Sequence, residues 1–374
     1  MFRSTLDHLA CHCQGRLTVL DEETAPGSQA TGGVADILYG TLLCQSCKER
    51  FPILQGVALV VPDVRGYLLH HIKGISKSVP EERIPKAFRK EYRSSLEELR
   101  ALEEEHIEED LESERVNALY LMNHYLSAKE MKKLEMRVIA SVSPTIQEWI
   151  ERYWDRGPMK VVSDWIPEKA SVLELGCGVG GLYRRMPETT QRYLGMDSSF
   201  HSVLIARHLN FAGPFTGRLV HPTDLLFGNS HCEFRIPPPM PKSKGGLLTA
   251  GDFVVAEIDA IPARKDSFDV SVSLNAIDML EEPESLVLAQ SGAVKKGGWI
   301  IQSGPYIWHE RIAKALRARL PKGGSDSATA VEWLYSKNGH EITNRELHVP
   351  WLFFKHLRQI ELYSVHAFVA RKGS

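Results

Sequence analysis

The chain has 374 residues, of which 43% are hydrophobic and 25% are charged, the composition of an ordinary globular protein. Its 45 basic and 47 acidic side chains leave a net charge of -2, so no global positive field favours a polyanionic partner, although a local basic patch stays possible. The sequence contains no apolar run of the ~20 residues that a membrane span needs and no signal-peptide core, which predicts a cytoplasmic protein without a membrane partner.

Three regions of different texture follow one another along the chain. Residues 1–65 are rich in turns and cysteines, and residues 66–160 are highly charged with a helical repeat of apolar positions, which predicts a helical linker or cap. From residue 161 to residue 374, apolar runs alternate with helical stretches, as in a parallel sheet covered by helices. The expected strands are residues 171–175, 192–196, 253–258, 268–274, 299–303, 341–349 and 360–369. An insertion with a proline-rich loop, residues 205–250, is a candidate lid.

Two close pairs of cysteines lie near the start of the chain: Cys11, Cys13, Cys44 and Cys47. Cysteine pairs joined by a β-rich linker suit a tetrahedral structural Zn²⁺ better than a disulfide framework, and His8 or His12 could replace one cysteine. The module resembles the small zinc-ribbon activator subunit of tRNA, rRNA and release-factor methyltransferases, fused here into one chain. Its first pair is a C-x-C where that family has C-x-x-C.

A glycine-rich turn follows the strand expected at residues 171–175, in the sequence Glu174-Leu175-Gly176-Cys177-Gly178-Val179-Gly180. Glycine adopts positive φ and lets the backbone approach a ligand closely. Glu174 would repel a pyrophosphate but tolerate an ammonium group, and Asp197 ends the next strand, where an acid can accept hydrogen bonds from both ribose hydroxyls. These residues predict a nucleoside site, and the alternatives are a dehydrogenase-like nucleotide site or an inactive relative.

The glycine turn and later segments together resemble the class I methyltransferase family. Residues 251–262 are similar to its third-strand motif, residues 266–270 to the lead into the fourth strand, and residues 295–299 to the turn before the fifth. The resemblance implies a Rossmann-like α/β fold with a seven-stranded sheet, preceded here by the zinc-ribbon-like module and the helical cap. It also implies S-adenosylmethionine as cofactor, with the third-strand acid Asp259 on the adenine amino group. The implied cofactor-binding residues are Glu174, Gly176, Gly178, Gly180, Asp197, Asp259 and Asn275.

The residues after the fourth expected strand should face the methyl acceptor, because ligands bind beyond the carboxyl ends of such strands. No Asn-Pro-Pro-Tyr motif and no cysteine nucleophile occur there, and Asp278 is either an acceptor ligand or an ordinary acid at a helix start. Residues 247–253, 300–309 and 362–372 resemble the carnosine N-methyltransferase family. That resemblance implies that Asp278, His309 and Tyr363 hold a substrate imidazole, although Asn275 stands where that family has an aromatic residue.

Asn117, Tyr120 and His124 in the charged helical region share one helical face, which is either a packing face or part of the acceptor pocket. The sequence as a whole predicts an N-methyltransferase that acts on a small molecule, for example the imidazole of histidine or of a histidine-containing compound. The zinc-ribbon resemblance supports an RNA or protein methyltransferase as the first alternative, so nucleic acid stays a less favoured partner. A non-catalytic nucleoside-binding module is the second alternative, and the oligomeric state is not predicted.

Overall fold

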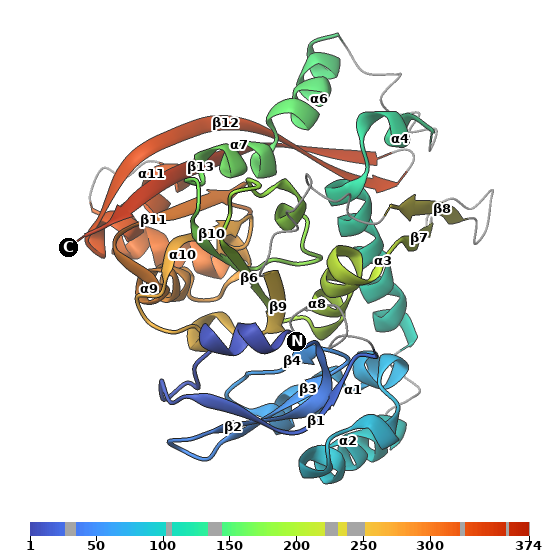
Figure 1. Ribbon diagram of the computed structural model, residues 1–374. Helices are drawn as coiled ribbons and strands as arrows, with labels where there is room; N and C mark the ends of the chain where they lie inside the picture. Colours follow the sequence, from blue (N-terminus) through green and yellow to red (C-terminus); the bar gives the residue numbers. More distant parts are fainter. Residues whose placement is uncertain are drawn as a thin grey trace.

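The structure is a computed structural model that describes residues 1–26, 35–101, 107–133, 144–220, 231–237, 251–321, 326–356 and 359–373. A seven-stranded sheet covered by helices forms its main body, and a four-stranded sheet from the start of the chain packs against one edge (Figure 1). The strands are β1 (Leu17–Thr24), β2 (Ile37–Cys44), β3 (Arg50–Leu54), β4 (Val57–Ala58), β5 (Ser171–Leu175), β6 (Arg192–Asp197), β7 (Phe215–Val220), β8 (His231–Ile236), β9 (Gly251–Val255), β10 (Phe268–Leu274), β11 (Val294–Gly304), β12 (His340–His356) and β13 (Gln359–Lys372).

Helices cover both faces of the large sheet. The α-helices are α1 (Val64–Ser78), α2 (Arg89–Ala101), α3 (Ile107–Tyr125), α4 (Ala128–Lys133), α6 (Pro144–Arg156), α7 (Pro158–Trp165), α8 (Phe200–Arg207), α9 (Pro283–Ala293), α10 (Glu310–Arg319) and α11 (Ser327–Lys337). Three short 3-10 turns concern the site: η4 (Leu182–Arg185), η6 (Ile258–Ala260) and η7 (Ile277–Met279). Among the described residues, no helix combines the length and the apolar character that a membrane crossing needs.

The large sheet has the strand order β12-β13-β11-β10-β5-β6-β9. The strands from β9 to β11 run parallel, and β13 pairs antiparallel with both β11 and β12. The direction of winding reverses between β5 and β10, and open α/β sheets bind their ligands in the crevice at such a switch point. The predicted seven-stranded α/β sheet is therefore confirmed, and its topology places a binding crevice at the carboxyl ends of β5 and β10.

Five of the seven predicted strands differ from the observed bounds, and two of these differences bear on the site. β9 already ends at Val255, so the acidic residues that follow lie in and around η6 rather than on a strand. β12 extends from His340 to His356, well past the predicted end at residue 349. Pro350 hides this extension because proline cannot donate to a strand ladder, but β12 is the edge of the sheet and tolerates it.

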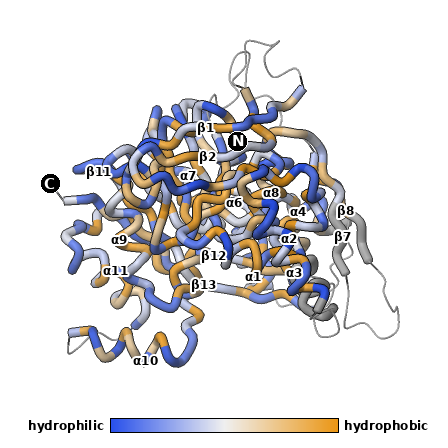
Figure 2. The backbone as a smooth tube through the Cα atoms, turned by 90° about the horizontal axis from the view of Figure 1, so that it is seen from below, coloured by the Kyte–Doolittle hydropathy of each residue, from blue (hydrophilic) through white to orange (hydrophobic). Residues whose placement is uncertain are grey.

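The interior is mainly apolar, with hydrophobic segments gathered at the centre of the molecule (Figure 2). Every residue of β5 and β9 is buried, as expected for parallel strands covered on both faces. One continuous cluster of buried side chains joins Leu42 and Phe51 of the four-stranded sheet to Phe253 of β9. The N-terminal module therefore shares a core with the main body and does not depend on a core of its own.

Backbone pairing fixes the N-terminal module to the edge strand β9. Leu59, just after β4, forms a parallel bridge with Val255, and the amide of Val60 donates to the Val255 carbonyl at 3.1 Å. The amide of Ala10 donates to the carbonyl of Pro262 at 2.9 Å, further along the same segment. The module thus covers an edge that would otherwise expose unpaired backbone groups.

A buried charge cluster completes this interface. Asp252 of β9 accepts hydrogen bonds from the Phe2 amide at 2.8 Å and the Thr5 hydroxyl at 2.6 Å, and it pairs with the guanidinium of Arg207. Arg207 also pairs with Asp36 of the module at 2.8 Å. Asp252 and Arg207 are almost completely buried, so each depends on the other for its charge partner, and the module adds Asp36 to Arg207 and two hydrogen-bond donors to Asp252.

The insertion predicted at residues 205–250 lies partly in the described residues. Its described part contains the end of α8 and the antiparallel hairpin of β7 and β8. Residues 221–230 and 238–250, which include most of the proline-rich loop, lie outside the described residues, so the lid stays a prediction. The three domains drawn at residues 65/66 and 160/161 also stay a prediction, although helices predominate in the described part of residues 66–160.

Candidate functional site

A cavity of about 1100 Å³ opens at the switch point of the large sheet. The carboxyl ends of β5, β6 and β10 and the residues after β9 form its floor, whereas α3, α6, the start of α7 and Trp351 of β12 form its roof. Pockets for small ligands usually measure ~300–1,000 Å³. The volume therefore suits a nucleoside cofactor together with a small second ligand.

The glycine turn after β5 has left-handed backbone at each glycine, with φ of 76° at Gly176, 50° at Gly178 and 75° at Gly180. A Cβ atom added at Gly178 would meet nothing within 4 Å, and Gly178 lines the cavity. A Cβ atom at Gly180 would instead lie 2.8 Å from the ring of Phe253, and Gly180 does not line the cavity. Gly178 therefore leaves room for a ligand. A Cβ atom at Gly176, which also lines the cavity, would lie 2.9 Å from the Cβ atom of Ala276, and Gly180 allows helix and sheet to pack.

Asp197 lies at the end of β6 and lines the cavity, as the sequence predicts. Its two carboxylate oxygens accept hydrogen bonds from the amide of Gly178 at 2.8 Å and from the amide of Ser199 at 2.9 Å. Burial raises its pKa, while these backbone bonds oppose the rise. Each oxygen keeps a further lone pair, so the carboxylate is oriented to accept hydrogen bonds from a ligand.

Glu174 lines the same cavity from the end of β5. Its carboxyl group accepts a hydrogen bond from the Tyr193 hydroxyl, and burial raises its pKa to about 8. No cation among the described residues pairs with Glu174, so a positively charged ligand would supply the missing charge. Glu174 is buried and Asp197 is half-buried, and together they place two carboxyl groups beside the glycine turn.

Asp259 lies in η6, is exposed and lines the cavity. Glu257, which the sequence analysis missed, also lines it, and burial together with the nearby charge of Asp259 raises the pKa of Glu257. Asn275 lines the cavity with a φ of 53°, a conformation that asparagine tolerates better than an aromatic residue. Its amide donates to the Ser303 carbonyl at 2.9 Å, and its side-chain oxygen accepts from the Ser303 hydroxyl at 3.1 Å.

The three predicted acceptor ligands do not meet on the cavity wall. Asp278 is buried behind the wall, where one oxygen accepts from the amide of Ile307 at 2.6 Å and the other has no partner in the described part of the chain. His309 is exposed at the N-terminus of α10 and does not line the cavity. Tyr363 stands behind Trp351, with ring centroids 4.8 Å apart, and donates to a neighbouring glutamate.

Asn117, Tyr120 and His124 of α3 all line the cavity, so the shared helical face turns toward it as one alternative predicted. Asn117 accepts a hydrogen bond from the hydroxyl of Ser202 at 2.9 Å. Burial and, to a smaller extent, the charge of Arg185 lower the pKa of His124 to about 3, so its imidazole is neutral. This face closes over the glycine turn and Asp197.

Two groups of functional candidates escaped the sequence analysis. Tyr153, Trp154, Arg185 and Trp351 line the cavity, and only Arg185, just after the glycine turn, stood near a recognised motif. Tyr67 of α1 is the second candidate that the sequence did not indicate. Its hydroxyl donates to the carbonyl of Ser198 at 2.7 Å and accepts from the amide of Phe200 at 3.0 Å. These two bonds fix the loop that directly follows Asp197.

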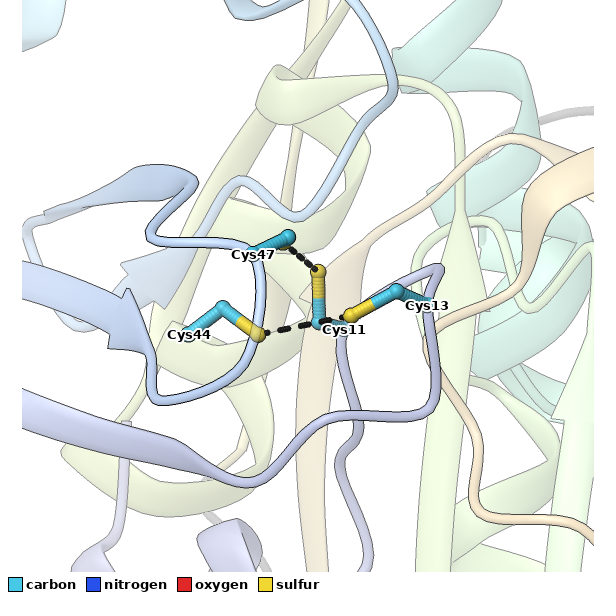
Figure 3. Close-up of side chains that lie close together, drawn as sticks. All are labelled: Cys11, Cys13, Cys44 and Cys47. Carbon is cyan, nitrogen blue, oxygen red and sulfur yellow. Dashed lines mark hydrogen bonds between the residues drawn. The ribbon is translucent and has the colours of Figure 1, made fainter.

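The four cysteines of the N-terminal module point toward one another from the loop before β1 and the end of β2 (Figure 3). Their sulfur atoms all lie within 4.8 Å of one another, with 3.5 Å between Cys11 and Cys47 and 3.5 Å between Cys13 and Cys44. A tetrahedral Zn²⁺ with bonds of about 2.3 Å separates its sulfur ligands by about 3.8 Å, so the cluster fits such an ion. Neither His8 nor His12 belongs to the cluster.

Two known protein families match separate parts of the chain. The profile of the Trm112p-like protein family matches residues 3–56, and that of a methyltransferase domain family matches residues 238–302. No curated protein matches the sequence. The two matches cover the cysteine module and part of the large sheet, which includes β9, β10 and most of β11.

Several solved structures are similar at low sequence identity. A complex between the Haloferax volcanii Trm112 methyltransferase activator and a protein described as a methyltransferase shows 14% identity, covers 60% of this chain and 92% of its own, and has a TM-score of 0.38. A Mesorhizobium loti S-adenosylmethionine-dependent methyltransferase shows 17% identity over 59% and 98%, with a TM-score of 0.35. A Thermotoga maritima protein described as a candidate histamine N-methyltransferase shows 15% identity over 64% and 99%, with a TM-score of 0.34. Similarity at this level carries no argument about function.

Proposed function

We propose that this chain, which joins a Trm112p-like domain to a methyltransferase domain, is an S-adenosylmethionine-dependent N-methyltransferase of a small molecule. The observation that carries the proposal is a pair of carboxyl groups, the buried Glu174 and the half-buried Asp197, on the wall of a cavity that also contains the open glycine Gly178. A pyrophosphate would be repelled there. A nucleoside that bears an ammonium and a sulfonium group would be attracted.

The residues that line the cavity suit each part of that cofactor. Asp197 would accept hydrogen bonds from the ribose hydroxyls, Glu174 would face the ammonium group, and Asp259 with Glu257 would bind the adenine amino group. When bound, S-adenosylmethionine supplies a methyl group that the lone pair of an acceptor nitrogen takes, while the C–S bond breaks toward sulfur and an N–H proton of the acceptor leaves to solvent. The chain orients both partners and keeps water out, which is the main source of rate that such a reaction needs.

For the acceptor we propose an imidazole, as in histidine or a histidine-containing compound. Support comes from the aromatic walls: Tyr120 and Trp351 line the cavity and offer ring faces to a flat heterocycle. Asp278 and Tyr363 would act from behind, since Asp278 anchors the Ile307 amide and Tyr363 stacks on Trp351. We assign them positioning roles and give His309 no role, because it is exposed outside the cavity.

The Trm112p-like match favours a second candidate function, the methylation of RNA or protein. A macromolecular substrate would have to insert a single base or side chain into the cavity. The acids on its walls, Glu174, Asp197, Glu257 and Asp259, would oppose a phosphate that followed the base. A non-catalytic nucleoside-binding module remains the third candidate.

Calorimetry with S-adenosylhomocysteine tests the cofactor. We expect binding to the wild type, a loss of about tenfold or more in Asp197→Ala, and no change in the control Asp155→Ala, an exposed acid of α6 outside the cavity. A wild type that does not bind, or an Asp197→Ala variant that binds equally well, would refute the proposal. A screen for S-adenosylhomocysteine release with imidazoles, amines, thiols and total RNA then separates the acceptors, and binding without turnover on any of them favours the non-catalytic module.

We also propose that the cysteine cluster holds a structural Zn²⁺. The four sulfur atoms supply a complete tetrahedral set, and such sites contribute directly to folding. Metal analysis of the purified protein should find one zinc per chain in the wild type and in the control Cys177→Ser, whose cysteine lies outside the cluster. Cys44→Ser should lose the metal and unfold at lower temperature, and a wild type that contains no zinc would contradict the assignment.

A further inference from the structure

One corner of the cavity differs in charge from the rest. The acids that line the cavity are Glu174, Asp197, Glu257, Asp259, Glu281 and Glu282. Among the described residues, only two lysine or arginine side chains line it, and the ammonium of Lys160 is already paired with Asp164. The guanidinium of Arg185 donates to the carbonyl of His124 at 3.1 Å, and no carboxylate among the described residues pairs with it. Arg185 therefore brings a free positive charge to one end of an acidic cavity.

Two polar groups on the cavity wall lack partners among the described residues. The ring nitrogen Nδ1 of His124 and the indole nitrogen Nε1 of Trp154 are buried and make no hydrogen bond within the described part of the chain, although both residues line the cavity. Buried polar groups in native proteins are nearly always satisfied, so two orphans on one cavity wall indicate that a ligand completes them. A neutral imidazole can place its proton on Nδ1, and an indole N–H only donates.

The three side chains come from different elements that line one cavity. His124 is on α3, Arg185 ends η4 and Trp154 is on α6. The Tyr153 hydroxyl donates to the carbonyl of Asn123 at 2.8 Å and so fixes α6 against α3. This corner also adjoins the glycine turn, because a Cβ atom added at Gly181 would lie 2.8 Å from His124 Nδ1.

We propose that Arg185, His124 and Trp154 form a carboxylate-binding subsite at the end of the cavity beside the glycine turn. One charged fork and two further hydrogen-bond donors suit a carboxylate and do not suit a cation. The inference rests on the proposed function, because the methionine end of S-adenosylmethionine carries one carboxylate next to the ammonium group. Glu174 binds the ammonium group, and Arg185, His124 and Trp154 bind the carboxylate. A carboxylate carried by the acceptor is the second source of the same chemistry.

Calorimetry with two nucleosides tests the subsite. S-adenosylhomocysteine has the carboxylate, whereas 5′-methylthioadenosine keeps the adenosine and sulfur but lacks the amino-acid end. In Arg185→Met we expect the affinity for S-adenosylhomocysteine to fall about ten- to hundredfold and that for 5′-methylthioadenosine to stay unchanged. Trp154→Phe, which removes one N–H donor and keeps an aromatic ring, should weaken only S-adenosylhomocysteine, by about three- to tenfold. The control Arg156→Met removes a charge that is paired with Glu346 outside the cavity, on the same helix as Trp154, and should change neither affinity.

The outcomes are distinct. Equal weakening of both nucleosides in Arg185→Met would overturn the subsite, since it would indicate general damage to the cavity. If S-adenosylhomocysteine binding is unchanged but the binding of L-histidine to that complex weakens relative to histamine, the subsite stands with the acceptor carboxylate as its ligand. If none of these affinities changes, the subsite is refuted while the proposed function survives. A wild type that binds neither nucleoside refutes the proposed function, and the subsite with it.

Discussion

Two glycines of one turn should respond to the same substitution in opposite ways. Gly178 and Gly180 both have left-handed backbone, so alanine at either position carries a strain of about 1–2 kcal/mol. This backbone strain is common to both positions, but the surroundings of the two glycines differ. A Cβ atom at Gly178 enters open space on the cavity wall, whereas one at Gly180 lies 2.8 Å from the Phe253 ring and 2.9 Å from Ala206.

The surroundings set the magnitudes. Phe253 and Ala206 are completely buried and cannot move aside freely, so Gly180→Ala adds an overpacking cost of about 1–3 kcal/mol. We therefore expect Gly180→Ala to lower the free energy of unfolding by about 2–5 kcal/mol and Gly178→Ala by about 1–2 kcal/mol. Gly178→Ala places a methyl group where a ligand would contact the backbone. It should cost about 1.4 kcal/mol or more of binding free energy, which is tenfold in affinity.

Urea denaturation measures the free energies of unfolding of the two variants. Calorimetry with S-adenosylhomocysteine on the folded variants measures the change in affinity. Gly180→Ala, if it folds, should bind with nearly wild-type affinity because its methyl group does not reach the cavity. The reasoning fails if Gly178→Ala binds as tightly as the wild type. It also fails if the two variants are equally stable, because the contact with Phe253 would then cost nothing.

Three further predictions concern charges and hydroxyl groups. Burial raises the pKa of Glu174 from 4.5 to about 8, so between these pH values the folded chain without ligand retains a proton that the unfolded chain releases. The free energy of unfolding should therefore fall as pH rises from about 5 to 8. Urea denaturation of Glu174→Gln should show a smaller fall over the same pH range. Arg207→Met leaves the buried carboxylate of Asp252 without its cation, whereas Asp36 keeps the N-terminal ammonium of Met1. The change should lower the free energy of unfolding by about 3–5 kcal/mol, which thermal unfolding would show as a large drop in Tm. Tyr67→Phe should lower the free energy of unfolding by about 1–3 kcal/mol, and so should the control Tyr92→Phe, because the Tyr92 hydroxyl also donates to a backbone carbonyl. Calorimetry should show weaker S-adenosylhomocysteine binding only for Tyr67→Phe.

The central sheet could be predicted because its strands are short apolar runs bounded by turn residues. Residues 171–175 and 268–274 correspond to β5 and β10 at both ends. The cysteine cluster was equally visible, since ligand spacing is a local property of the sequence. The glycine turn was visible for the same reason, although its three glycines proved to have different roles.

The acceptor side could not be predicted, because it is assembled from distant segments. Trp351 reaches the cavity only because β12 continues past Pro350, and Trp154 arrives on a helix with no recognised motif. Asp278 stands at the expected position in the sequence, but its side chain turns away from the cavity to accept the Ile307 amide. A position after a strand places a residue near a site, and only tertiary packing decides where its side chain points.

The N-terminal module supports one half of the candidate cofactor site. It pairs with β9 at Val255, immediately before the turn that presents Glu257 and Asp259, and Tyr67 holds the loop after Asp197. The glycine turn follows β5, which is flanked by strands on both sides and needs no such support. Fusion in one chain keeps the module permanently at this edge, without the loss of affinity that a separate subunit would incur. Damage to the module should therefore weaken the contacts to ribose and adenine more than those to the amino-acid end.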